Sequence, residues 1–112
     1  MEISSQIERG VTVVSITGSI DGFTASEVLQ VLESEIQAGI RNLVVELGGV
    51  DFISSAGLRA VLMAQKQMRE QGGDVRLAGS RPNVFRTFKI SGYTSIFKMF
   101  ADTQAAISSF TG

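Results

Sequence analysis

Short apolar stretches alternate with amphipathic helical patterns along most of this chain, and few folds accommodate that alternation. Strands that are separated by helices pair in parallel, because each helix returns the chain to the same end of the sheet. At the N-terminus, two β-branched runs flank Arg9-Gly10 and predict an antiparallel hairpin instead. The sequence therefore predicts a single α/β domain over residues 1–112, in the order ββαβαβαβα. Its sheet is expected to be mixed and mostly parallel, with about five strands and about four helices.

Local signals set the expected ends of these elements. Thr24 followed by Glu27 forms a capping-box pattern at the start of the first helix. Pro82 and Gly92 bracket the third helix, and Asp102 caps the last one. The expected strands cover residues 3–7, 11–16, 43–47, 75–78 and 96–100, and the second helix covers about 56–71. Phe52, Phe97 and Phe100 could belong to the core or to an interface, and the core is favoured, while Thr111-Gly112 is expected to be a frayed end.

The composition excludes several classes of protein. The chain has no histidine, which removes the usual general base, the Ser-His-Asp triad and most transition-metal sites. It has no cysteine, which excludes disulfides and thiolate chemistry and fits a cytoplasmic protein. A net charge of −1 without basic blocks disfavours binding to nucleic acids, and no apolar run is long enough to cross a membrane. We therefore expect a binding protein rather than an enzyme, without a cofactor or metal.

Two adjacent serines, Ser54 and Ser55, stand where a strand pattern gives way to a helix pattern. Function in α/β sheets gathers in the loops after the strands, and two such loops are expected, over residues 18–23 and 48–55. From its position, Ser55 is either an N-cap that stabilises the helix by about 1 kcal/mol or a phosphoryl acceptor at a helix N-terminus. Gly57 favours the second interpretation, because it leaves the first turn open to another molecule.

Other motifs that use serine, phosphate or aspartate do not fit this region. A nucleophile elbow around Ser55 requires a glycine where Ile53 stands. The phosphate-binding loop G-x-x-x-x-G-K-[ST] has no match in the chain. A phospho-aspartate receiver domain would use Asp51, but the acidic pair expected after the first strand is missing. Asp21, the one carboxylate in the other loop, is by itself typical of a turn.

With these residues in place, the chain resembles a STAS domain, a family named after sulfate transporters and anti-sigma factor antagonists. The resemblance covers essentially the whole chain. It rests on the loop Gly18-Ser19-Ile20-Asp21, the strand and its exit over residues 43–50, the motif Asp51-Phe52-Ile53-Ser54-Ser55-Ala56-Gly57-Leu58 and the turn Ile90-Ser91-Gly92-Tyr93. It implies a STAS-like fold and, for a standalone domain of this length, an anti-sigma factor antagonist. In such proteins, a serine at the start of the second helix is phosphorylated by a serine kinase that is also the anti-sigma factor.

The best-known motif of the family reads Asp-Ser-Ser/Thr-Gly-Leu, and its first hydroxyl residue is phosphorylated. Anchored on Gly57-Leu58, the motif places the acceptor at Ser55, the family's aspartate at Ser54 and the second hydroxyl residue at Ala56. Ser-Ala-Gly-Leu versions occur in the family, so the resemblance keeps the acceptor role at Ser55. The missing aspartate bears on which kinase recognises the site.

The resemblance implies a switch in protein binding. The unphosphorylated protein would bind the anti-sigma kinase, phosphorylation would release it, and a serine phosphatase would reset the switch. The implied binding surface consists of Asp21, Ser54, Ser55, Gly57, Arg59 and Lys66. Arg59 and Lys66 are explained equally well as two solvated charges. The alternative function is a STAS module of a transporter-accessory or stress-signalling assembly without phosphorylation, and the sequence leaves the oligomeric state open between a monomer and a weak dimer.

Overall fold

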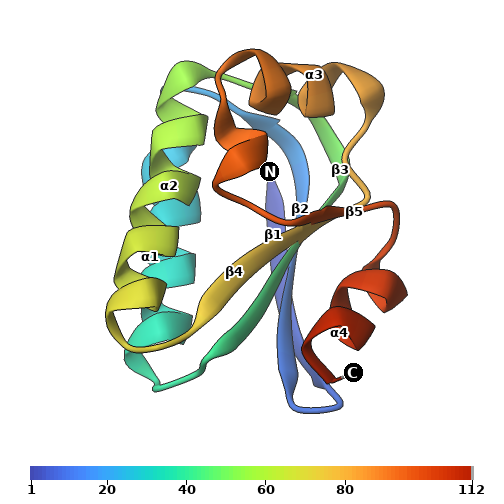
Figure 1. Cartoon of the computed structure of the whole chain (residues 1–112). Coiled ribbons are helices and arrows are strands. Elements are labelled where there is room, and N and C mark those ends of the chain that lie inside the picture. Colours follow the sequence, from blue (N-terminus) through green and yellow to red (C-terminus); the bar gives the residue numbers. More distant parts are fainter. Residues whose placement is uncertain (112) are drawn as a thin grey trace.

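The structure is a computed structural model that describes residues 1–111. Its elements follow the predicted order, with one additional turn of 3₁₀ helix (Figure 1). They are β1 (Glu2–Glu8), β2 (Val11–Ile20), α1 (Ala25–Gln37), β3 (Asn42–Ile53), α2 (Ser55–Glu70), β4 (Asp74–Ala78), α3 (Pro82–Ile90), η1 (Tyr93–Ser95), β5 (Met99–Phe100) and α4 (Thr103–Thr111). Thr111 is thus helical rather than frayed, and Gly112 lies outside the described residues.

The five strands form one sheet in the order β1-β2-β3-β4-β5. β1 pairs antiparallel with β2, and the other three pairings are parallel. The hairpin turns at Arg9 and Gly10, whose φ angles of 52° and 75° are both left-handed, as a two-residue hairpin loop requires. The predicted mixed, mostly parallel sheet is confirmed. β1 therefore forms one edge of the sheet, and its outer side pairs with no strand of residues 1–111.

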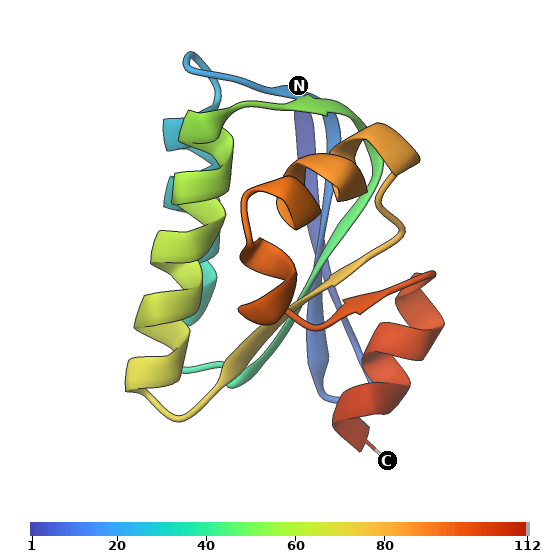
Figure 2. The same cartoon turned by 45° about the horizontal axis from the view of Figure 1, so that its top comes forward.

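The helices cover the two faces of the sheet unequally. The larger core cluster lies between one face and the apolar sides of α1, α2 and α3, and it includes Leu32, Val61 and Phe88. A smaller cluster joins the opposite face to α4 through Ala106 and Ile107 (Figure 2). Asp102 caps α4 as predicted, its carboxylate accepting the Ala105 N–H at 2.8 Å. Within residues 1–111, no helix has the length and apolar character needed to cross a bilayer.

Of the two expected functional loops, 18–23 is strand over its first half and 48–55 is mostly strand. β2 continues to Ile20 and β3 to Ile53, and these extensions pair with each other. The register shifts between Ser15 and Thr17 and between Gly18 and Ser19, so the strands bend instead of ending. Gly49 permits this pairing, since a Cβ atom there would lie 2.7 Å from the Thr17 hydroxyl. A glycine pair that is typical of a turn is here part of an irregular strand pairing.

The last strand is shorter than predicted. Residues 96–98 remain outside it, because Tyr93–Ser95 forms η1 and Phe97 turns into the core. The rings of Phe88, Tyr93 and Phe97 pack together with centroids 6.1–6.3 Å apart, which fixes this irregular path. The core assignment of the three phenylalanines is wrong for Phe52, which is 51% exposed. Phe100 is half-buried against the cluster of α4.

A buried glutamine completes the edge of β4 that the short β5 leaves open. The N–H groups of Leu77 and Gly79 donate to carbonyls of Lys98 and Phe100. One step earlier along β4, β5 is absent, and the Gln65 side chain of α2 takes its place. Its Oε1 accepts the Val75 N–H at 2.8 Å, and its Nε2 lies 3.1 Å from the Val75 carbonyl and 2.8 Å from the Asp74 carboxylate. The Gln65 side-chain amide, although it belongs to a helix, thus continues the row of hydrogen bonds along the edge of β4.

Candidate functional site

Ser54, and not Ser55, is the N-cap of α2. Its backbone is extended, with φ −90° and ψ 174°, and its Oγ accepts the Gly57 N–H at 3.1 Å. The Ser54 N–H donates to the Ile20 carbonyl at 2.8 Å, which joins the helix start to the end of β2. The interpretation of Ser55 as the cap is therefore wrong by one residue. Capping occupies the hydroxyl of the first serine and leaves the second without this role.

Ser55 is the first residue of α2, and its side chain is exposed. No hydrogen bond within residues 1–111 engages its hydroxyl. The N–H groups of the first helical turn point toward this end, where the helix dipole also favours negative charge. A phosphoryl group on Ser55 would therefore interact favourably with the helix dipole. Its addition would break no hydrogen bond within the part of the chain that the structure describes.

Gly57 has a different role from the expected one. It is buried, and a Cβ atom at this position would lie 2.8 Å from side-chain carbons of both Ile20 and Ile53. The Ile20 carbonyl oxygen would be 3.0 Å away. The absence of a side chain thus lets α2 begin directly on the ends of β2 and β3. The expectation that Gly57 keeps the first turn open to another molecule is wrong, because its own chain fills that space.

Asp21 organises the turn between β2 and α1. Its Oδ1 accepts the N–H groups of Phe23 at 2.9 Å and Thr24 at 3.1 Å. Thr24 returns the bond, since its Oγ1 lies 2.9 Å from the Asp21 N–H, and it also donates to the Ser19 carbonyl at 2.8 Å. The reciprocal capping pair is therefore Asp21 with Thr24, and the predicted pair of Thr24 with Glu27 is wrong by one turn. The N–H groups of Phe23 and then Thr24 lower the pKa of Asp21 below its ordinary value of 3.8.

These contacts predict the effect of changing Asp21. We expect Asp21→Asn to keep most of the thermal stability at neutral pH, because the amide oxygen still accepts both N–H groups, whereas Asp21→Ala loses several degrees. A lowered folded-state pKa adds stability above the unfolded value, and that stability is lost as the pH falls through the folded value. Melting temperatures of the wild type and Asp21→Asn should therefore converge as the pH falls below the lowered folded-state pKa of Asp21. Equal losses in the two variants at pH 7 would contradict the role of the acceptor.

Hydrogen bonds connect α3 to the edge of the sheet at which Ser54 and Ser55 lie, which we call the serine edge. The Ser19 hydroxyl lies 2.7 Å from the Asp51 carboxylate, and the Asn83 side chain donates to the Asp51 carbonyl at 2.8 Å. The Arg81 side chain donates in the same way to the Gly48 carbonyl at 3.0 Å. β4 ends at Ala78 and pairs with β3 only as far as Glu46. Beyond this point, these side chains take the place of a paired strand beside β3. Asp51 is therefore a structural carboxylate, and within residues 1–111 no group of three acidic residues, as a metal site would need, lies near it.

Exposed apolar side chains surround the serine edge, and the sequence reasoning missed them. Phe23, at the tip of the Asp21 turn, is 95% exposed, and Phe52 at the end of β3 is also exposed. Between α1 and α2, a groove of about 160 Å³ is lined by Leu29, Ala56 and Met63, among others. The available signal was the position of Phe23, an aromatic residue inside a turn and outside any apolar period.

The two predicted basic residues lie on the outer face of α2 at different distances from Ser55. Arg59 is exposed one turn from Ser55 and lines the groove between the helices. Lys66 is also exposed, but eleven residues separate it from Ser55, about 16 Å along the helix axis. The fold thus brings together Asp21, Ser54, Ser55 and Arg59, whereas Lys66 belongs to the same face but not to the same cluster.

The sequence of this chain matches a known family. A family model described as the STAS domain matches residues 2–106. The chain belongs to the STAS domain family. Among its relatives, the protein BtrV of Bordetella bronchiseptica, which is named as an anti-sigma factor antagonist, is 36% identical over 110 residues. The match covers 98% of this chain and 95% of the relative.

Solved structures of STAS proteins share the fold over nearly the whole chain. An anti-sigma factor antagonist from Mycobacterium paratuberculosis is similar with a TM-score of 0.91 at 22% identity, covering 99% of this chain and 94% of that one. The Bacillus cell fate determinant SpoIIAA in its phosphorylated form has a TM-score of 0.75 at 18% identity, covering 97% and 99%. The predicted STAS-like fold is confirmed, and anti-sigma factor antagonists are the relatives of this domain.

Proposed function

We propose that this STAS domain is an anti-sigma factor antagonist that works as a phosphorylation-gated binding switch in the cytoplasm. Unphosphorylated, it binds and sequesters a serine kinase that is also an anti-sigma factor, and so frees a sigma factor. The kinase phosphorylates Ser55, which ends the complex, and a serine phosphatase restores the binding form. The names of the relatives support the anti-sigma partner, and the acceptor assignment rests on the site itself.

The unequal use of the two serine hydroxyls carries the proposal. Ser54 Oγ is engaged as the N-cap, so its phosphorylation would remove the hydrogen bond to Gly57. Ser55 Oγ is exposed and has no such bond. A kinase can therefore reach and modify Ser55 while α2 keeps its cap. The fold also occurs in a phosphorylated protein, since SpoIIAA was solved in that form.

The proposed kinase-binding surface consists of Phe23, Phe52, Ser55, Arg59 and Met63. Phe23 is held on a turn that Asp21 fixes, so little conformational entropy is lost when its ring enters a pocket of the partner. Buried aromatic anchors and arginines carry most of the energy in protein interfaces. A phosphoryl group of about −2 charge among these residues would lose its water when the complex forms. We expect no group of the kinase to be positioned there to compensate for this charge. Phosphorylation should therefore abolish binding rather than weaken it slightly.

Phosphate mapping tests the acceptor. We expect that a purified anti-sigma serine kinase of the host, incubated with ATP and the wild-type protein, adds one phosphoryl group at Ser55. Ser55→Ala should remain unmodified, and the neighbouring Ser54→Ala should still be modified even though loss of its cap costs about 1 kcal/mol. Mass spectrometry of peptides covering residues 42–66 distinguishes the two serines. Phosphate on Ser54 would contradict the assignment of Ser55 as the acceptor, and no phosphate in the wild type would contradict the proposed switch and favour a STAS module that only binds.

A further inference from the structure

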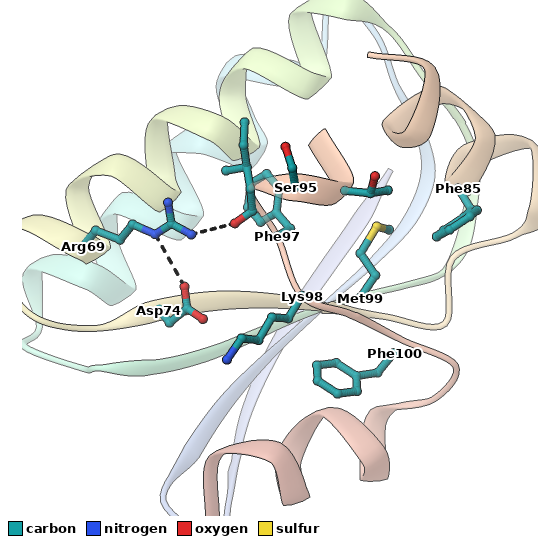
Figure 3. Close-up of a pocket in the computed structure, with 10 residues that line it drawn as sticks. Arg69, Asp74, Phe85, Ser95, Phe97, Lys98, Met99 and Phe100 are labelled. Carbon is teal, nitrogen blue, oxygen red and sulfur yellow. Dashed lines mark hydrogen bonds and ion pairs between the residues drawn. The ribbon is translucent and has the colours of Figure 1, made fainter. Parts of the chain in front are cut away.

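A second candidate site lies at the opposite end of α2 from Ser55. An open cavity of about 560 Å³ is lined by the last turn of α2, the start of β4, α3, η1 and the chain leading into β5 (Figure 3). A neighbouring hollow of about 390 Å³ shares Phe85, Met99 and Phe100 with it. We call the two together the β5 cavity. Its volume is within the range of small-molecule sites. Arg69, at its rim, is fourteen residues from Ser55, about 21 Å along the helix.

The β5 cavity combines an apolar wall with a few polar groups. Phe85 of α3 remains 40% exposed there, and Met99 and Phe100 are half-buried. At the other side lie the cations Arg69 and Lys98 and the exposed Thr94. Figure 3 shows Arg69 and Lys98, from different elements, on the Asp74 side of the cavity, with the Lys98 ammonium directed away from Phe85 and Met99. A concave apolar wall with a few convergent polar groups is the usual composition of a ligand site.

Charge is distributed unevenly around this cavity. The 27 residues from Val75 to Ala101, which form most of its wall, contain five basic residues and no acidic one, although the whole chain has a net charge of −1. Four of the five, Arg81, Arg86, Lys89 and Lys98, form no ion pair within residues 1–111.

The single carboxylate at the rim of the cavity is already compensated. Asp74 lies 3.0 Å from the Arg76 guanidinium and 3.7 Å from that of Arg69, and it also accepts the Gln65 amide. Arg69 is held in place by its bond to the Ile96 carbonyl at 2.6 Å, and its second terminal nitrogen has no partner within residues 1–111. Among the residues that line the cavity, the two cations Arg69 and Lys98 therefore outnumber the one carboxylate, Asp74.

We propose that the β5 cavity binds a small amphiphilic anion, with its carboxylate or other acidic head near Lys98 and Arg69 and its apolar tail or ring against Phe85, Met99 and Phe100. The distance from Ser55 makes this site separate from the kinase-binding surface, so it stands whether or not Ser55 is phosphorylated. An anion is selected because the head meets two cations, whereas a neutral analogue of the same tail gains only the apolar contacts.

Titration of the full chain with octanoate, followed by ¹⁵N–¹H NMR, tests the site. We expect saturable shifts confined to the amides of Phe85, Thr94 and residues 96–100. The neutral analogue 1-octanol should bind about tenfold more weakly. Lys98→Gln should weaken octanoate binding about fivefold without changing that of 1-octanol, as loss of one exposed charge implies. Lys66→Gln, an equally exposed lysine on the outer face of α2, is the matched control and should change neither.

Three results would overturn the proposal. The first is the absence of shifts at these amides up to about 10 mM octanoate, since such weak binding would be below 3 kcal/mol. The second is equal affinity for octanoate and 1-octanol, which would make the cavity merely apolar. The third is an equal effect of Lys98→Gln and Lys66→Gln, which would indicate a general response to net charge. The spectrum of each variant reports directly whether it is folded.

Discussion

Ser55→Asp is expected to lower the affinity for the anti-sigma kinase by at least about 100-fold, which corresponds to about 2.7 kcal/mol of binding free energy. The carboxylate stands in for the phosphoryl charge on the proposed surface, which also includes the exposed residues Phe23, Phe52 and Arg59. We expect this charge to lose its water in the complex, a cost that the helix N-terminus and Arg59 offset only in part. Titration calorimetry with the purified kinase measures the change.

The same substitution should leave the stability of the free protein nearly unchanged. Ser55 is exposed at the first position of α2, where a negative charge interacts favourably with the helix dipole by about 0.3–1 kcal/mol. We therefore expect a melting temperature within a few degrees of the wild type. A loss of several kcal/mol on unfolding would show instead that the Ser55 side chain is structural.

Ser55→Asn separates charge from size, because asparagine has the shape of aspartate and no charge. We expect it to keep the kinase affinity within about threefold of the wild type, a difference below 1 kcal/mol. Ser4→Asp, on the exposed side of β1 and away from the surface, controls for a general effect of added negative charge. If asparagine and aspartate at position 55 weaken binding equally, the switch does not depend on charge and the proposed mechanism is wrong.

The largest change in stability is expected from Gln65→Leu, which should lower the free energy of unfolding by about 2–4 kcal/mol. Leucine has a similar volume but leaves the Val75 N–H and carbonyl buried without partners. Each such group costs about 1–3 kcal/mol when it is removed from water unpaired. For a domain of this size, the melting temperature should fall by at least about 8 °C.

Gln67→Leu provides the matched control two residues along the same helix. Gln67 is only partly buried, and its amide bonds to the Glu33 side chain, which water can solvate when the bond is lost. We expect a cost of about 1 kcal/mol or less. Guanidinium unfolding of the two variants, compared at equal m-values, measures the difference. Similar losses of unfolding free energy in both variants would mean that the Gln65 side chain is not needed to complete the hydrogen bonds of β4.

Sequence patterns predicted the elements of this fold better than their ends. The hairpin at Arg9-Gly10, the helix beginning at Pro82 and the cap at Asp102 depend on local chemistry, and all three are confirmed. The ends of β2 and β3 depend on pairing between strands that lie about 30 residues apart, and a local pattern does not contain that information. For the same reason, the glycines at 48 and 49 were assigned to a turn although they lie inside β3.

The candidate site was predicted in part. A serine at the start of α2 follows from the pattern, but which of two adjacent hydroxyls caps the helix depends on the backbone of one residue, the extended conformation of Ser54. The sequence singled out Gly57, but the requirement for glycine at this position comes from the close approach of Ile20, which lies on a strand distant in sequence. The exposure of Phe23 was missed because composition alone assigns an aromatic residue to the core, although its position inside a turn and outside any apolar period indicated otherwise.

The open outer edge of β1 bears on how this protein behaves at high concentration. Seven residues of strand with unpaired backbone groups offer a template on which another chain can add. The edge carries Glu2, Gln6 and Glu8 and is polar at most positions, with Ile3 packed on the core and only Ile7 strongly exposed, at 74%. Carboxylates repel a second copy of the same edge and keep intermolecular strand addition unfavourable. Charge along β1 thus disfavours association through this edge, while the exposed apolar side chains Phe23 and Phe52 lie outside β1.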